Sequence, residues 1–121
     1  MFLATINKPK RLLLLSYIGN VIAPELEQGL AEGVPLLDDL GSGFRVLADF
    51  SQLDSMGVNC APLIGKLMEL AESKGVSLIV RVIPHPRKDI GLNILSLFHY
   101  RQQPQTVTCE SMAEAARALG I

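Results

Sequence analysis

The sequence has no tryptophan, only two histidines and only two cysteines, Cys60 and Cys109. The cysteines lie far apart and outside any Cys-x-x-Cys spacing, so neither a disulfide framework nor a structural zinc site is expected. We therefore expect the reducing cytoplasm as the compartment, and we expect no metal and no cofactor.

The sequence also lacks an excess of charge of one sign. It contains 11 basic and 12 acidic residues, which gives a formal net charge of -1. This balance argues against nucleic acid as a partner. The apolar run Leu12–Leu15 is far shorter than the roughly 20 residues that span a bilayer, so no membrane span is expected. The 121 residues, 49% of them hydrophobic, fit a single domain over residues 1–121.

The first third of the chain predicts an antiparallel pair of strands followed by a helix. Alternating apolar residues in Phe2–Ile6 and the apolar run Leu12–Ile18 predict the two strands, with a proline-containing turn between them. A helical pattern begins at Ala23. We expect this helix to kink or break near Val34, because a residue that precedes a proline avoids the helical region.

The remainder alternates strands and helices. Phe44–Phe50 predicts a strand, and residues 61–75 predict a helix that ends at Gly75. Val76–Ile83 is almost continuously apolar, which is typical of a strand covered on both faces in a parallel sheet. The last predicted elements are a helix capped by Asp89 through residues 90–100, a strand over 105–109 and a helix from a Ser111–Glu114 capping box to about Leu119.

Parallel strands joined by helical crossovers present their helix-leading loops at one edge of the sheet. The predicted loop over residues 51–59 and the predicted loop over residues 84–89 are therefore expected to emerge side by side. Open α/β sheets usually carry their functional groups at this edge.

Three stretches of the sequence resemble the STAS domain, which is named for sulfate transporters and anti-sigma factor antagonists. They are "VLADFSQLDSMGV", "ESKGVSLIVRVI" and "TVTCESMAEAARAL". The resemblance implies an α/β fold with a mixed sheet of about five strands and helices mainly on one face. It also implies a non-catalytic bacterial signalling module whose protein partner is a kinase or an anti-sigma factor-like protein.

The family carries Asp-Ser-Ser-Gly or a similar sequence after the "VLADF"-like strand, and its second hydroxyl residue is phosphorylated. Here the stretch reads Asp54, Ser55, Met56, Gly57, so methionine occupies the phosphoacceptor position. The resemblance implies a partner surface formed by Ser51 and these four residues, without the usual phosphoserine switch. Ser55 is either a phosphorylation site at a helix N-terminus or a simple cap of a turn.

The second loop predicts an anion-binding or docking site. Pro84 and Pro86 stiffen the chain around an exposed histidine, and two basic residues precede the expected helix N-terminus. The alternative is that the aspartate only caps the helix while the basic residues solvate the surface. The candidate residues of this site are His85, Arg87, Lys88 and Asp89.

No catalytic constellation emerges, and we therefore predict that the protein is not an enzyme. Cys60 precedes a helix and has the position of a reactive thiol, but no histidine lies near it in the sequence, and unpaired cysteines are more often small buried residues. His99 is expected to act as a helix C-terminal cation or a packing residue.

Two further hypotheses concern ligands and assembly. The apolar helix Ile90–Tyr100 provides an alternative function, a carrier of a small apolar ligand or lipid with a pocket beneath this helix. The opening hairpin has a long apolar edge that charged residues protect only at the turn, so a homodimer is expected.

Overall fold

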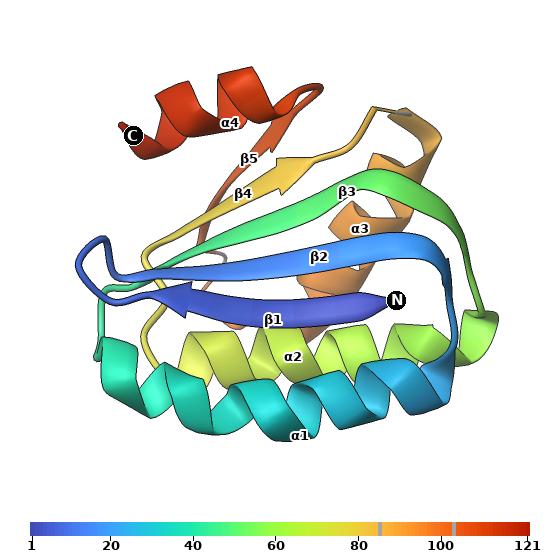
Figure 1. Cartoon of the computed structure of the whole chain (residues 1–121), viewed down its shortest axis with the longest axis horizontal. Helices are drawn as coiled ribbons and strands as arrows, with labels where there is room; N and C mark the ends of the chain where they lie inside the picture. The colour runs from blue at the N-terminus through green and yellow to red at the C-terminus, as the bar shows by residue number, and fades with distance from the viewer. Residues whose placement is uncertain (85, 103) are drawn as a thin grey trace.

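The structure is a computed structural model that describes every residue except 85 and 103, and for residues 86–90 it describes the backbone alone. Strands and helices follow one another in the predicted order (Figure 1). The elements are β1 (Phe2–Asn7), β2 (Leu12–Val21), α1 (Ala23–Leu40), β3 (Arg45–Met56), the 3₁₀ helix η1 (Val58–Cys60), α2 (Ala61–Ser73), β4 (Leu78–Val82), α3 (Pro86–His99), β5 (Gln105–Cys109) and α4 (Met112–Leu119).

One mixed sheet has its strands in the order β1-β2-β3-β4-β5. β1 is antiparallel to β2, while β2, β3, β4 and β5 are parallel to one another. The predicted opening hairpin is therefore confirmed. β4 lies between β3 and β5, as its almost continuously apolar sequence predicted.

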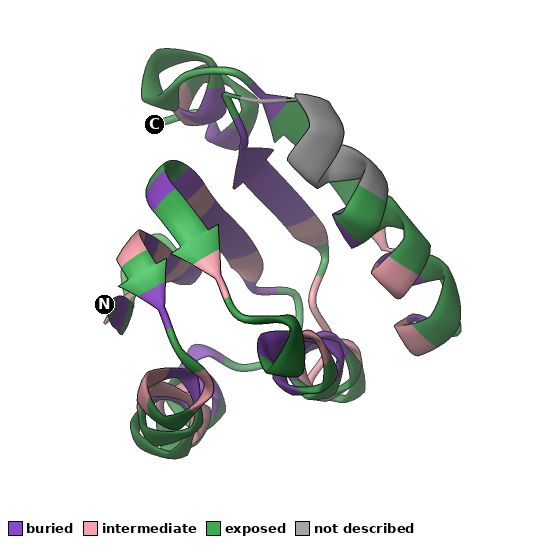
Figure 2. Ribbon diagram, turned by 90° about the vertical axis from the view of Figure 1, so that its right-hand side faces the viewer, coloured by how far each residue is buried: buried purple, intermediate pink, exposed green. Residues whose placement is uncertain are grey.

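Three helices cover one face of the sheet and α4 lies against the other, so the predicted fold with helices mainly on one face is confirmed (Figures 1 and 2). The larger core lies beneath α1, α2 and α3, where Tyr17 stacks on Phe50 with ring centroids 4.4 Å apart. The smaller core joins Ala115 and Leu119 of α4 to the opposite face. In the part of the chain that the structure describes, no helix is long and apolar enough to cross a membrane.

Of the kink or break predicted near Val34, the break does not occur, because α1 continues through Pro35 to Leu40. A proline inside a helix removes one hydrogen bond and crowds the preceding turn. Packing against the sheet offsets this cost. A side chain at Gly33 would meet the Cβ of Ala4 at 2.9 Å, so the glycine lets α1 lie directly against β1.

The predicted loop over residues 51–59 is also corrected, because β3 continues to Met56. β2 extends to Val21 and supplies the partner strand, with Ser55 opposite Asn20 and Met56 opposite Val21. Two register shifts accompany this extension. Of the five residues of the predicted partner surface, Ser51, Asp54, Ser55 and Met56 therefore lie on β3, and Gly57 follows its end.

Candidate functional site

The end of β3 forms one wall of an apolar groove with a volume of about 490 Å³. Met56, Gly57 and Val58 line this wall, and Leu92 and Ile94 of α3 line the opposite one. The other lining residues are Phe50, Leu53, Ser55, Ala61, Ile64, Gly91 and Leu95. We call this feature the β3–α3 groove. It brings together Ser55, Met56 and Gly57 of the partner surface predicted from the sequence.

The remaining two residues of that predicted surface do not line the groove. Ser51 and Asp54 are exposed on β3, and the backbone N–H of Ser51 donates to the Asp49 carboxylate at 2.9 Å. Ser55 has a structural partner of its own, because its hydroxyl donates to Oδ1 of Asn20 at 2.5 Å. This bond crosses from β3 to β2, so Ser55 lies on a strand and caps neither the turn nor the start of the helix that the sequence had predicted.

Several exposed apolar side chains lie on the elements that line the groove, and the sequence interpretation did not identify them. Val58 is 95% exposed at the start of η1, and Leu97 and Phe98 on α3 are 69% and 81% exposed. In Figure 2, α3 lies at the margin of the molecule and turns much of its surface outwards. The signal in the sequence was that "IGLNILSLF" is apolar around the whole helix, which is unusual for a helix with one solvated face.

The second predicted site, the anion or docking loop, lies largely outside the described residues. His85 lies outside the described residues, and the side chains of Arg87, Lys88 and Asp89 lie outside them as well. Their role in anion binding stays a prediction. The backbone nevertheless corrects the expected helix boundary, because α3 begins at Pro86, three residues before the predicted cap Asp89. Proline is well suited to the first position of a helix.

Arg81 on β4 connects the sheet to α3 through side-chain hydrogen bonds. Its side chain is only 3% exposed, and its guanidinium donates to Oδ1 of Asn93 at 2.9 Å and to the hydroxyl of Ser96 at 2.6 Å. A buried arginine requires such partners, because an ionised group away from water is costly when its donors are unmet. These bonds fix the position of α3 and hence of the second wall of the groove.

Two buried tyrosines, Tyr17 and Tyr100, keep their phenolic protons at neutral pH. Burial raises the pKa of Tyr17, with smaller contributions from Tyr100 and Cys60. Burial also raises the pKa of Tyr100 to about 12, although the Arg81 charge opposes the shift. A cavity of about 40 Å³ lies between these side chains, which is room for about one water molecule. Both phenols are therefore protonated at neutral pH.

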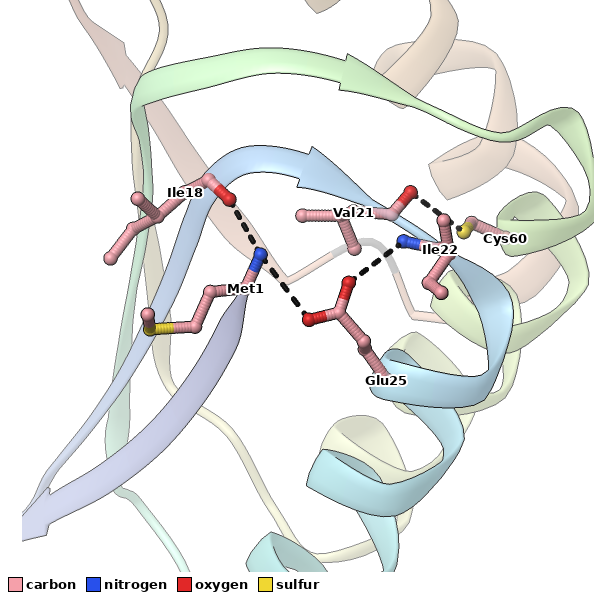
Figure 3. Close-up of polar contacts among 6 residues, drawn as sticks. All are labelled: Met1, Ile18, Val21, Ile22, Glu25 and Cys60. Carbon is pink, nitrogen blue, oxygen red and sulfur yellow. Dashed lines mark hydrogen bonds and ion pairs between the residues drawn. The ribbon is translucent and has the colours of Figure 1, made fainter.

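Cys60 and His99 have packing roles. Cys60 is fully buried at the start of α2, and its thiol donates to the carbonyl oxygen of Val21 with 3.8 Å between sulfur and oxygen (Figure 3). A small buried thiol has little access to a substrate. His99 lies at the end of α3, where its Nδ1 is 2.9 Å from the Glu69 carboxylate of α2. Within the described residues, no three side chains of His, Cys, Asp or Glu are grouped to hold a metal ion.

Comparisons with protein-family models and with curated proteins find no match. Solved structures do match in fold. An uncharacterised protein of the DUF3478 family from Shewanella loihica, with a SpoIIAA-like fold, has a TM-score of 0.67 and 16% identity over 98% of this chain and 92% of that one. The unphosphorylated anti-sigma factor antagonist SpoIIAA gives 0.61 and 16% over the whole of both chains.

A third structure, an anti-sigma factor antagonist from Mycobacterium paratuberculosis, has a TM-score of 0.59 and 18% identity over 100% of this chain and 94% of that one. These likenesses define the class of the fold: the chain is an α/β protein with a SpoIIAA-like fold. The STAS-like fold predicted from the sequence is thereby confirmed. Identities this low establish the fold alone.

Proposed function

We propose that this chain is a non-catalytic regulatory module that binds a protein partner through the β3–α3 groove. The observation that carries the proposal is the position of Met56, Gly57 and Val58, which form an accessible apolar wall at the end of β3. An exposed apolar surface of this kind is typical of a docking site. Covering one valine or leucine side chain contributes about 1.5–3 kcal/mol.

Met56 favours a binding surface that is not switched by phosphate at its own position. A thioether is polarizable and flexible, so it adapts to an apolar partner, and it has no hydroxyl to phosphorylate. The hydroxyl of Ser55 is already bonded to Asn20. We infer that binding is constitutive, or regulated by something other than phosphorylation at Met56.

The partner is proposed to be a kinase or an anti-sigma factor-like protein in a bacterial cytoplasm. Two of the similar structures are described as anti-sigma factor antagonists, and this description supports the class of partner. We propose that residues 1–121 act as one domain. We also propose that the protein acts as a homodimer, whose contact surface is the edge strand β1 rather than the groove.

A pull-down from the host lysate, with the wild type and three variants as baits, tests the partner proposal. Met56→Glu places a carboxylate in the apolar groove and is expected to lose the partner that the wild type captures, since a desolvated charge without a partner is costly. Met112→Glu is the matched control, because Met112 is an exposed methionine on α4, which packs on the other face of the sheet. Ser55→Ala is expected to leave capture unchanged. Loss with Ser55→Ala and retention with Met56→Glu would contradict the proposal.

The second candidate function is a carrier of a small apolar ligand or lipid. The same groove favours it, because about 490 Å³ falls within the usual range of ligand sites and because α3 forms one wall, as the sequence predicted. Native mass spectrometry of protein purified from its host distinguishes the two functions. A retained adduct of lipid size that disappears in Met56→Glu supports the carrier, and an unmodified mass with a co-purifying protein supports the regulatory module.

A further inference from the structure

The strand β1 forms one edge of the sheet, and within the described residues it pairs with β2 alone. Its sequence, Phe2–Asn7, contains no charged residue and no proline, and its pairing with β2 has no register shift. Natural sheets usually protect an edge of this kind with charges, proline or a bulge. An edge without these features is a template for another strand.

The hydrogen bonds at the start of β1 show which backbone groups face outwards. The amino group of Met1 donates to the carbonyl of Ile18 at 2.6 Å (Figure 3). The N–H of Ile18 donates in return to the carbonyl of Met1 at 2.8 Å. Bonded and non-bonded pairs alternate along an antiparallel ladder, so Leu3 and Thr5 also face β2. The N–H and C=O groups of Phe2, Ala4 and Ile6 therefore point away from the sheet.

We propose that β1 pairs with β1 of a second copy of this chain in an antiparallel arrangement, about a two-fold axis at Ala4. Phe2 of each copy then lies opposite Ile6 of the other, and Ala4 lies opposite itself. All three residues exchange both backbone hydrogen bonds, so every outward group finds a partner. If the two β1 strands were parallel, no two-fold axis would relate the two copies, and they would not form a closed dimer.

Side chains on both faces of β1 fit this arrangement. Phe2 and Ala4 pack against Gly29 and Gly33 of α1, which hold the strand in place before a partner arrives. On the opposite face, Leu3 is 47% exposed and Thr5 is exposed. The proposed register places Leu3 of one copy directly opposite Thr5 of the other, in a position without backbone hydrogen bonds where Cα atoms are about 4.5 Å apart.

The charges near β1 are compatible with the same orientation. Lys8 lies in the turn after the strand, and Glu25 lies beside Met1 at its start, 3.5 Å from the amino group. The antiparallel arrangement brings the Lys8 end of one copy towards the Glu25 end of the other. It therefore keeps the two Lys8 side chains apart, and like charges do not meet across the axis.

Cysteine trapping tests the register. The double variant Leu3→Cys/Thr5→Cys is expected to form a covalent dimer under mild oxidation, because its new cysteines are opposite each other across the axis, within disulfide reach. The natural cysteines are buried and do not compete. Each single variant is expected to stay uncrosslinked. Equal dimer formation by the single variants, or no covalent dimer from the double variant, would overturn the proposed register.

Sedimentation velocity with a pair of proline variants tests the interface itself. The wild type is expected to sediment as a dimer at about 50 μM, a concentration that populates dimers of micromolar affinity. Ala4→Pro removes one outward N–H and keeps the bonds to β2, so a folded monomer is expected, whose melting temperature falls only by the contribution of dimerisation. Thr5→Pro is the control that breaks a bond to β2 and lowers the melting temperature. A monomeric wild type, or a dimeric, folded Ala4→Pro, would refute the interface.

Discussion

The guanidinium of Arg81 on β4 donates to the hydroxyl of Ser96 on α3 at 2.6 Å, and this hydroxyl in turn donates to the carbonyl of Leu92 at 2.9 Å. The central sheet is thus bonded through a side chain to the backbone of the helix that forms one wall of the β3–α3 groove. The groove depends on this connection, because α3 lies at the margin of the molecule and exposes much of its apolar surface.

Replacing Arg81 with methionine is expected to destabilise the protein and to loosen α3. The variant loses charge-assisted hydrogen bonds to Asn93 and Ser96, for which we expect a decrease of about 2–4 kcal/mol in the free energy of unfolding. Urea denaturation measures this decrease, and hydrogen exchange of the α3 amides measures the loosening. Arg101→Met is the exposed control, with an expected change below about 0.5 kcal/mol. Equal stability of the two variants would contradict the role of Arg81.

Gly65→Ala is expected to displace α3, because the new methyl group would overlap the ring of His99. Overpacking of this kind costs about 1–3 kcal/mol, measured by chemical denaturation. Gly91→Ala is the matched control on α3, since none of the described residues outside the helix's own backbone lies within 4 Å of the position of its methyl group. This control is expected to be neutral or stabilising by up to about 1 kcal/mol, through the higher helix propensity of alanine. A stable Gly65→Ala would show that α2 and α3 are not in close contact there.

Ser111→Ala is expected to destabilise α4 by about 1 kcal/mol. The Ser111 hydroxyl accepts from the backbone N–H of Glu114 at 3.2 Å, and the Glu114 carboxylate accepts from the N–H of Glu110 at 3.3 Å. Thermal denaturation measures the loss. Ser111→Asp retains an acceptor at the cap and is expected to restore most of the stability, whereas a failure to rescue would show that the cap is not the cause.

Stability is expected to decrease as the pH rises above about 10. Burial raises the pKa of Tyr100 from 10.0 to about 12, so between these values the unfolded state loses its phenolic proton while the folded state keeps it. Fewer protons bound in the unfolded state mean a free energy of unfolding that falls with pH, by about 1–3 kcal/mol across this window. Urea denaturation between about pH 9 and 12, a range chosen to span the tyrosine pKa values, measures the slope of the free energy of unfolding against pH. Tyr100→Phe is expected to reduce the slope, with the remainder due to Tyr17, whose pKa burial also raises. An unchanged slope in this variant would contradict the assignment.

The fold was largely predictable, because the capping and turn residues agree with the spacing of apolar residues in most of the chain. The Ser111–Glu114 spacing predicted a capping box, and one half of it is confirmed, because the Ser111 hydroxyl accepts from the N–H of Glu114. The Glu114 carboxylate accepts from the N–H of Glu110 and not from that of Ser111. The apolar run Val76–Ile83 predicted an interior strand, and β4 lies inside the sheet. In these stretches a single local rule determines the outcome.

Tertiary contacts determine the features that were missed. Pro35 predicts a break, but Gly33 packs against Ala4 on one side of the proline and Leu37 and Leu40 are buried on the other. The polar stretch after Phe50 predicts a loop, yet the extension of β2 gives it a partner strand as far as Met56. The sequence "IGLNILSLF" is apolar around the whole helix, but which of its side chains are exposed, such as Phe98, depends on where α3 packs.

Site-specific photo-crosslinking is the most direct test of the central claim, that the β3–α3 groove binds a protein partner. A photoreactive phenylalanine replaces Val58, whose side chain is 95% exposed beside the groove, or Met112 on α4 as the control. In host cells, illumination is expected to give one discrete adduct of protein size from position 58, absent when Met56→Glu is added, and none from position 112. No adduct at position 58, or the same adduct from both positions, would contradict the account.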